Sequence, residues 1–252
     1  MRGIKGKVAV VTGAAQGIGR AIAERLASDG ALVAAVDLVE SKHAIAAIAD
    51  AGGRGAAFIA DVSSADAIGR AVAEIQSRLG PVSILVNNAG LHANPLTPFS
   101  ELSFEQWRRM MSVDLDSMFL FCKAVVTDMQ SARWGRIINM SSAAVNALTP
   151  VGMVHYVTAK AGVVGFTRGL ATDLGEYGIT VNAVAPSGVR TPDLQAIGAS
   201  DGVMQMVANS QAIKRIMEPS DIVGAVSFLA SDDAAMITAQ VLFADGGAIR
   251  AG

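Results

Sequence analysis

The chain has 252 residues, of which 52% are hydrophobic and 17% are charged, and its formal net charge at pH 7 is −2. This balance, with lysines and arginines scattered along the chain, excludes the basic surface typical of nucleic-acid binding. The single cysteine excludes an internal disulfide, and no apolar run approaches the roughly 20 residues that span a bilayer. We therefore expect one domain, residues 1–252, in a cytoplasmic protein that binds neither nucleic acid nor membrane.

The first informative segment is an amino-terminal strand and the loop that follows it. Four β-prone residues, Val8-Ala9-Val10-Val11, precede the sequence Thr12-Gly13-Ala14-Ala15-Gln16-Gly17-Ile18-Gly19. Glycines let the chain turn sharply into a helix whose backbone amides can bind a pyrophosphate. The spacing is G-x-x-x-G-x-G, and a glycine-rich turn by itself more often marks a tight connection. The candidate cofactor contacts in this loop are Gly13, Gln16, Gly17, Ile18 and Gly19.

The end of the second strand predicts which cofactor is bound. A helix from Gly17 to Asp29 leads to the apolar run 31–36, which Asp37 closes. An acidic side chain at this place accepts hydrogen bonds from the adenosine ribose and repels a 2′-phosphate, and neither Leu38 nor Val39 supplies the arginine that such a phosphate requires. We predict NAD(H) and not NADP(H). The alternative is a strand-end aspartate that only faces water.

Apolar strands continue to alternate with helices along the rest of the chain. Predicted strands are 56–60, 84–87, 136–140, 180–185 and 241–244, and predicted helices are 64–79, 104–130, the segment from Tyr156 to Gly175, and 221–230. This alternation predicts an α/β fold, a Rossmann-type doubly wound parallel sheet with ligands at the carboxyl ends of its strands. The candidate site residues at these strand ends are Gly13, Asp37, Asp61, Asn88, Ser142 and Pro186.

Tyr156 and Lys160 are the strongest indication of catalysis. Residues four apart share one face of a helix, so a phenol and an ammonium would stand side by side. Free tyrosine has a pKa of about 10, and a neighbouring cation favours the phenolate and lowers this value. The pair can therefore exchange protons with a substrate, near the polar Ser141-Ser142. For an isolated Tyr-x-x-x-Lys match the usual explanation is an exposed pair without a role, but the motifs around this one argue against it.

The remaining reactive side chains do not suggest a metal. His43, His92 and His155 lack metal-ligand spacing, although His92 and His155 could contact a substrate. Cys122 lies in an apolar segment, where we expect it to be a small buried hydrophobic residue, with catalysis a remote alternative.

Together these motifs resemble the short-chain dehydrogenase/reductases of about 250 residues, over essentially the whole chain. The matching motifs are Thr12 to Gly19, Asp61-Val62, Asn87-Asn88-Ala89-Gly90, Ser142, Tyr156 with Lys160, Asn182 through Thr191, and Asp245-Gly246-Gly247. The resemblance implies a homotetramer, and within the family the chain looks closest to secondary-alcohol dehydrogenases such as 1-phenylethanol dehydrogenase.

The resemblance also implies roles for individual residues. The implied cofactor contacts beyond the glycine loop and Asp37 are Asp61, Val62, Asn88, Ala89, Gly90, Tyr156, Lys160, Pro186, Val189 and Thr191. Asp61 and Val62 would contact the adenine, and Val189 and Thr191 the nicotinamide carboxamide. Ser142 would bind the substrate oxygen, Tyr156 would exchange its proton, and Lys160 would hold the ribose and favour the phenolate.

Two residues depart from the family pattern. Asp114 stands where the family has an asparagine that helps to hold a relay water near the lysine. We expect the main-chain carbonyl of Asp114 to keep this catalytic role. Ser187 stands where the family usually has glycine after the proline, so the backbone there is less permissive.

The segment 191–219 follows the last implied cofactor contact and predicts a lid over the substrate. Its apolar residues are Leu194, Ile197, Val203, Met204, Met206, Val207, Ile213, Ile216 and Met217. Such a lid suits a hydrophobic or aromatic ketone, although the same surface could equally pack in the core or against another subunit.

Three functions remain open at this stage. The first is an NAD-dependent alcohol dehydrogenase or ketone reductase. The second is an NADP(H)-dependent 3-oxoacyl thioester reductase, which Asp37 and the lack of an obvious basic cluster for a carrier protein disfavour. The third is a dinucleotide sensor without catalysis, for which the trio of Ser142, Tyr156 and Lys160 would be superfluous.

Overall fold

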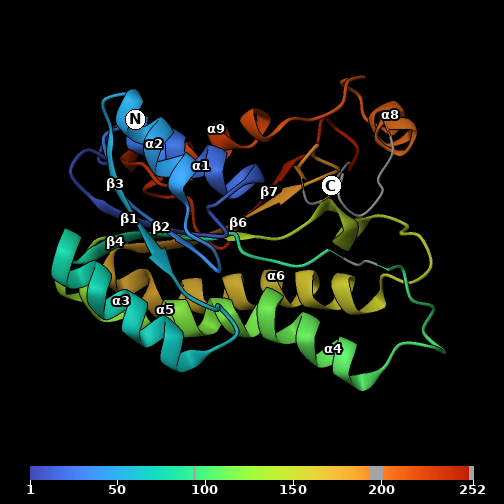
Figure 1. Ribbon diagram of the computed structural model, residues 1–252, viewed down its shortest axis with the longest axis horizontal. Helices are drawn as coiled ribbons and strands as arrows, with labels where there is room; N and C mark the ends of the chain where they lie inside the picture. The colour runs from blue at the N-terminus through green and yellow to red at the C-terminus, as the bar shows by residue number, and fades with distance from the viewer. Residues whose placement is uncertain (93–94, 193, 195–200, 250–252) are drawn as a thin grey trace.

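In the part of the chain that the computed structural model describes, residues 1–92, 95–192, 194 and 201–249, seven parallel strands form the centre of the molecule (Figure 1). Their order across the sheet is β3-β2-β1-β4-β5-β6-β7. The strands are β1 Val8–Thr12, β2 Leu32–Asp37, β3 Arg54–Ile59, β4 Val82–Asn87, β5 Gly135–Met140, β6 Ile179–Pro186 and β7 Val241–Ala244. The predicted Rossmann-type doubly wound parallel sheet is confirmed.

The winding direction of the sheet reverses at β1. Val8 of β1 lies opposite Leu32 of β2 on one side and Val82 of β4 on the other. The chain therefore builds outward from β1 to β3, crosses back to β4 and then builds in the other direction to β7. In such sheets ligands bind at the carboxyl ends of the strands where the order reverses, which here means the loops after β1 and β4.

Helices cover both faces of this sheet. On one face lie α1 Gly17–Ser28, α2 Lys42–Asp50 and α9 Val223–Leu229, and on the other α3 Ala65–Leu79, α5 Ser117–Ala132 and α6 Val154–Leu174 (Figure 1). The helix α4 Phe104–Met111 packs against α6, and α8 Asp201–Ser210 lies at the same end of the molecule.

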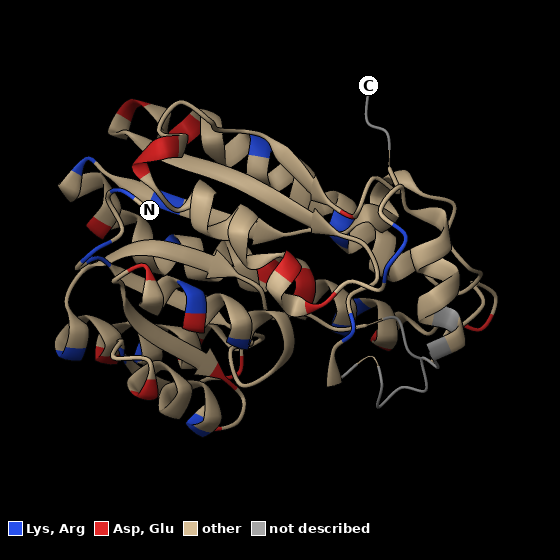
Figure 2. Cartoon of the chain, turned by 90° about the horizontal axis from the view of Figure 1, so that it is seen from above, with Lys and Arg blue, Asp and Glu red and all other residues tan. Residues whose placement is uncertain are grey.

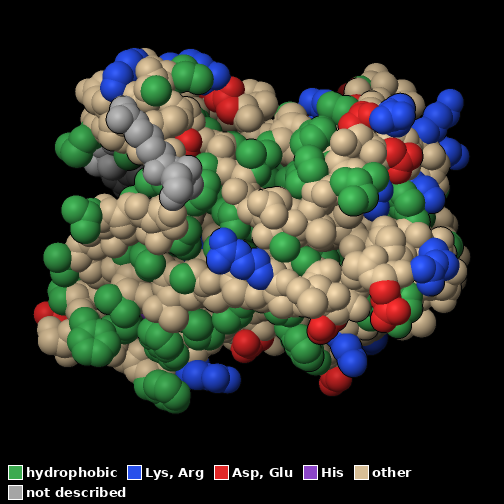
Figure 3. Space-filling model, turned by 180° about the vertical axis from the view of Figure 1, so that it is seen from behind, with side chains coloured by type: hydrophobic (Ala, Val, Ile, Leu, Met, Phe, Trp, Pro, Cys, Tyr) green, Lys and Arg blue, Asp and Glu red, His purple; other side chains and the backbone are tan. Residues whose placement is uncertain are grey.

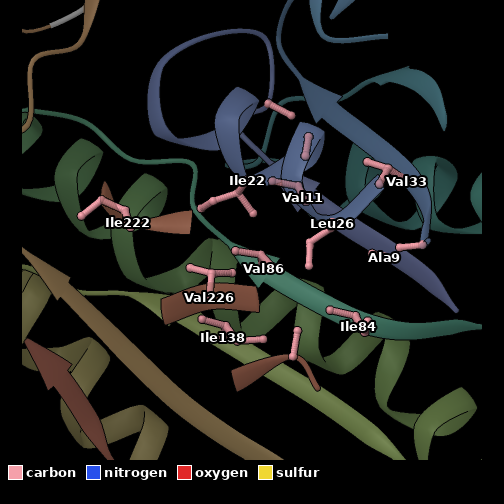
Figure 4. Packing of buried hydrophobic residues seen from close by; sticks show 14 of the residues in the cluster. Ala9, Val11, Ile22, Leu26, Val33, Ile84, Val86, Ile138, Ile222 and Val226 are labelled. Atoms are coloured by element: carbon pink, nitrogen blue, oxygen red, sulfur yellow. The ribbon is translucent and has the colours of Figure 1, made fainter. Parts of the chain in front are cut away.

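The side chains of the strands alternate between the two layers of the core. Ala9 and Val11 of β1 pack in the layer beneath α1 and α9, where Figure 4 shows them with Ile22 and Val226. Val8 and Val10 point the other way and pack in the layer with residues of α3 and α5. Both faces of each central strand are therefore buried, as expected for a parallel sheet, and this explains why the strand sequences show little polar alternation.

Several elements differ from the sequence-based expectation. The predicted helix 104–130 is divided by a π-helical turn, η1 Ser112–Asp116, and the predicted helix 221–230 begins as a 3-10 turn, Pro219–Asp221. The helices α2 and α8 were not predicted. α2 is only two to three turns long and no side chain caps its amino end, so its sequence carries little helix-start signal. α8 lies within the predicted lid. Ile197 falls outside the described residues.

Charged residues lie mainly on helices and loops, with both signs interspersed (Figure 2). No helix among the described residues has the length and apolar character needed to cross a bilayer.

Candidate active site

Hydrogen bonds join the loops after β1 and β4. The backbone amides of Asn88 and Ala89 both donate to Thr12 Oγ1, each at 3.0 Å. Asn88 Nδ2 donates to the carbonyl oxygen of Thr12 at 2.9 Å. Asn88, predicted to support the cofactor, therefore lies beside the predicted phosphate loop. Thr12 had no predicted role of its own, although its position as the polar last residue of an apolar strand was a usable signal.

The glycine loop leaves no room for a side chain at Gly13 or at Gly19. Gly13 has a φ of +65°, and a Cβ atom on Gly19 would clash with the carbonyl oxygen of Gly13. Gln16 precedes α1, and its side chain makes no capping hydrogen bond to the helix. The backbone amides of the first turn are thus not capped by this side chain, and together with the closely packed glycines they fit a pyrophosphate.

Asp37 ends β2 and faces this loop. Its Oδ2 atom accepts a hydrogen bond from the backbone amide of Ala15 at 2.9 Å, and its Oδ1 atom lies 3.4 Å from the amide of Val39, which donates to it. The side chains of Leu38 and Val39 that follow are exposed. The carboxylate is therefore fixed beside the glycines, where its predicted contact with the ribose stays a prediction.

Asp61 and Val62 follow β3 at the same edge of the sheet. Asp61 Oδ1 accepts hydrogen bonds from Ser63 Oγ at 2.7 Å and from the Ser63 amide at 2.8 Å. These two bonds, first from the side chain and then from the backbone, lower the pKa of Asp61 and keep it ionised. Val62 is buried. Their contact with adenine stays a prediction.

The two adjacent serines after β5 have different partners. Ser141 Oγ donates to the carbonyl oxygen of Lys160 at 3.0 Å, so its hydroxyl hydrogen is used to hold α6 against β5. Ser142 Oγ instead accepts a hydrogen bond from the amide of Ala144 at 3.2 Å, at the start of a short 3-10 turn. That bond leaves the hydroxyl hydrogen of Ser142 available for a substrate oxygen, which favours the predicted choice of Ser142 over Ser141.

Tyr156 and Lys160 lie on α6, as predicted. Lys160 Nζ is 5.8 Å from the centroid of the Tyr156 ring, and it donates to the carbonyl oxygen of Met140 at 3.2 Å. The lysine is only 5% exposed. Burial alone would lower the pKa of Lys160, but the charges of Asp114 and then Tyr156 outweigh burial and raise it. Lys160 is therefore a buried cation at neutral pH.

Asp114 is in direct contact with this lysine. Its Oδ2 atom lies 3.0 Å from Lys160 Nζ, its Oδ1 atom accepts the Leu91 amide at 2.7 Å, and its side chain is fully buried. A Cβ atom on Gly90 would come within 3.1 Å of Asp114 Oδ2 and 3.2 Å of Lys160 Nζ, so the glycine is what lets the loop approach the pair. We had expected a role for the main-chain carbonyl of Asp114. The contact made by its side chain was not foreseen.

The segment after β6 lies against the amino end of α1. A Cβ atom on Gly17 would be 3.4 Å from the methyl group of Thr191, and Pro186, Val189 and Thr191 are all buried. Ser187 is not among the described residues with positive φ, which outside glycine are Arg133 and Ala239. The replacement of the family glycine at 187 therefore creates no backbone strain.

The other reactive side chains have distinct environments. His155 is 6% exposed, and its Nδ1 atom has no hydrogen-bond partner. Cys122 is buried as predicted, and burial raises the pKa of its thiol to about 12. Among the described residues no group of His, Cys, Asp and Glu is arranged to hold a metal ion.

Known proteins are similar in sequence to this chain. A family profile described as enoyl-(acyl carrier protein) reductase matches residues 13–248. The chain is 39% identical over 244 residues to 3-oxoacyl-[acyl-carrier-protein] reductase FabG of Haemophilus influenzae, covering 97% of this chain and 98% of that protein.

Solved structures agree with these sequence matches. A short-chain dehydrogenase/reductase from Serratia marcescens superposes with a TM-score of 0.89 at 35% identity, covering 97% of this chain and 98% of that one. A Beutenbergia cavernae protein assigned to NAD(P)-dependent gluconate 5-dehydrogenation, with NADP bound at low occupancy, gives 0.89 at 35% identity, covering 96% of both chains.

Proposed function

Because the chain belongs to the short-chain dehydrogenase/reductase family and is therefore an oxidoreductase, we propose that it transfers a hydride between NAD(H) and a secondary alcohol or ketone with a hydrophobic or aromatic body. The observation that supports this most is the arrangement of Tyr156 and Lys160 on one face of α6, with Lys160 tied to β5 just before Ser142. A protein that only bound a dinucleotide would not require a buried cation beside a phenol.

Each residue of the trio has a chemical task in this proposal. A bound nicotinamide supplies or accepts the hydride. During oxidation Tyr156 takes the hydroxyl proton of the alcohol, and during reduction it returns a proton to the carbonyl oxygen. Ser142 donates a hydrogen bond to the same oxygen, and Lys160 stabilises the phenolate and holds the ribose. Acid–base help of this kind typically contributes about 10²- to 10⁴-fold in rate.

Asp37 supports NAD over NADP. Its carboxylate is anchored by the Ala15 amide, so it cannot easily turn away from a 2′-phosphate, and the two residues after it are hydrophobic. Bringing a phosphate next to this carboxylate would place like charges together without an arginine between them. The NADP bound to the Beutenbergia relative makes this specificity a point for direct measurement.

The surface near Tyr156 supports a hydrophobic substrate. Leu96, Leu148 and Val151, which we call the apolar rim, are large and exposed. Leu148 and Val151 belong to the segment that joins Ser142 to Tyr156 in the sequence. Gly152 of this segment packs closely on Leu96 and Thr97, so the segment adjoins the loop after β4. Figure 3 shows hydrophobic side chains at the end of the molecule that carries α4 and α8. In this proposal α8 belongs to the lid over the substrate.

A 3-oxoacyl thioester reductase is the second candidate, favoured by the Haemophilus influenzae relative. A substrate panel separates the two functions. Aryl ketones, alkyl ketones and a 3-oxoacyl thioester are offered with NADH and with NADPH, and initial rates are compared. We expect the highest kcat/KM for an aryl or alkyl ketone with NADH. Preference for the thioester with NADPH would establish the second candidate in its place.

The catalytic assignment is tested by Tyr156→Phe. The variant keeps the aromatic ring but loses the phenolic hydroxyl that exchanges the proton. Turnover should therefore fall by at least about 10²-fold, while NADH affinity stays close to that of the parent. Tyr177→Phe removes the other tyrosine of the chain, which lies beyond the far end of α6, and should leave turnover unchanged. Turnover of Tyr156→Phe within a few-fold of the parent would show that Tyr156 is not the acid–base group.

A further inference from the structure

The ion pair of Asp114 and Lys160 is buried where η1 packs against α6. Asp114 Oδ2 lies 3.0 Å from Lys160 Nζ, and Asp114 Oδ1 accepts a hydrogen bond from the Leu91 amide at 2.7 Å. The side chain of Asp114 is fully buried and Lys160 is only 5% exposed, so water screens neither charge effectively. Because the family pattern has an uncharged asparagine at position 114, this chain adds a buried negative charge to that pattern.

This ion pair adjoins the place where a nicotinamide would react. In the proposed function the nicotinamide faces a substrate carbon whose oxygen contacts Tyr156 and Ser142. Lys160 lies on the face of α6 that carries Tyr156, and it donates to the last carbonyl group of β5, just before the two serines. A Cβ atom on Gly90 would be 3.1 Å from Asp114 Oδ2 and 3.2 Å from Lys160 Nζ, so the predicted cofactor loop after β4 touches both charges. The charge of Asp114 therefore acts at the nicotinamide end of the proposed cofactor site.

The two redox forms of the cofactor differ in charge at this end. The nicotinamide ring of NAD carries a positive charge, whereas the ring of NADH is neutral. A fixed negative charge nearby therefore lowers the free energy of bound NAD and leaves that of bound NADH nearly unchanged. The positive charge of Lys160 does not alter this difference between an aspartate and an uncharged residue at position 114, because Coulomb energies from separate charges add.

We propose that Asp114 makes the site discriminate between the two redox forms of its cofactor, so that NAD binds more tightly relative to NADH than it would with an uncharged residue at position 114. This inference rests on the proposed function, which gives the position of the nicotinamide. Asp114 acts on the ring through its electric field and is a specificity-determining residue for the cofactor.

The charged side chains of the elements around the pair are screened by water. The helix α4 packs against both η1 and α6, and it carries Glu105, Arg108 and Arg109, which are all exposed. Asp116 on η1 is exposed too, and the formal charges of these four side chains cancel. On α6, burial lowers the pKa of His155 more than the charge of Asp114 raises it, so this imidazole is neutral at neutral pH. The buried negative charge beside Lys160 is therefore that of Asp114.

Asp114→Asn tests the proposal because it removes the charge and keeps an oxygen that can accept the Leu91 amide. The dissociation constants of NAD and NADH are measured by calorimetry at neutral pH, without substrate, for the parent and the variant. The ratio of the NAD constant to the NADH constant should rise about 10-fold in the variant, mainly through weaker binding of NAD. Asp116→Asn removes a charge of the same sign from an exposed position of the same π-helical turn, and it should leave the ratio unchanged. An unchanged ratio in Asp114→Asn would overturn the proposal.

Two further titrations distinguish a fixed buried charge from other causes of a changed ratio. The difference between Asp114→Asn and the parent should persist at high salt, because ions screen buried charges weakly, and its loss at high salt would contradict the proposal. Calorimetry in two buffers of different protonation enthalpy detects protons that are taken up or released on binding. Proton exchange large enough to account for the changed ratio would also contradict it, since a titrating group would then be responsible.

The outcome for Asp114 is separable from that for the proposed function. If the ratio rises but no alcohol or ketone is turned over, the proposed function fails and the role of Asp114 stands. If a ketone is turned over but the ratio does not change, the proposed function stands and this inference fails. Asp114→Ser also removes the charge and provides the same test should Asp114→Asn fail to fold.

Discussion

At the scale of single residues, partners across the fold decide the chemistry more than residue type does. Ser141 and Ser142 are identical neighbours in sequence, yet one hydroxyl is bound to the carbonyl of Lys160 and the other faces the start of a 3-10 turn. The Tyr156–Lys160 pair was predictable because i and i+4 share a helix face. The contact of Asp114 with Lys160 was not, because it joins residues 46 positions apart where η1 packs against α6.

The phosphate loop yields a prediction at this scale. In Gly19→Ala the new Cβ collides with the Gly13 carbonyl and must displace the turn, so we expect the dissociation constant for NADH, measured by fluorescence titration, to rise at least about 10-fold. Gly69→Ala, at an exposed position of α3 where a Cβ meets nothing, should leave NADH binding unchanged and stabilise the protein by roughly 0.5–1 kcal/mol. Tight NADH binding by Gly19→Ala would mean that the turn is not the phosphate site.

At the scale of elements, the long strands and helices were predictable and their irregular parts were not. Apolar runs of four and six residues indicated β1 and β2 because both faces of these strands are buried. The π-helical turn at Ser112–Asp116 left no such signal, since over five residues the apolar pattern of a π-turn hardly differs from that of an α-helix. This turn nevertheless carries Asp114.

The start of the helix α4 yields a prediction at the scale of elements. Ser103 and Gln106 form a capping box at its start, and residues of α4 pack in one cluster with Tyr156. Ser103→Ala should lower the free energy of unfolding by about 1 kcal/mol in urea denaturation and speed amide exchange within α4. Ser100→Ala, at an exposed turn position just upstream, should change neither. Equal exchange rates in the two variants would show that the cap does not stabilise α4.

At the scale of the whole molecule, the alternation of elements predicted a parallel sheet with its ligands at one edge, but could not give the strand order. That order depends on pairings between distant segments, such as β1 with β4, which no local pattern encodes. Once β1 lies between β2 and β4, Gly13, Asp37 and Asn88 come together, so the proposed dinucleotide site draws on both halves of the sheet.

Binding across both halves should stabilise the entire fold, and Cys122 can report it. The thiol is buried on α5 and its pKa is raised to about 12, so a thiol reagent should modify it only after the fold opens. When opening is in rapid equilibrium, NAD at about 100 times its dissociation constant adds about 2.7 kcal/mol of stability, which slows labelling about 100-fold. NADP at the same concentration should have little effect, because Asp37 repels its 2′-phosphate. Cys122→Ala gives the blank, since the chain has no other cysteine. Equal protection by both dinucleotides would mean that Asp37 does not select the cofactor, whatever the turnover rates suggest.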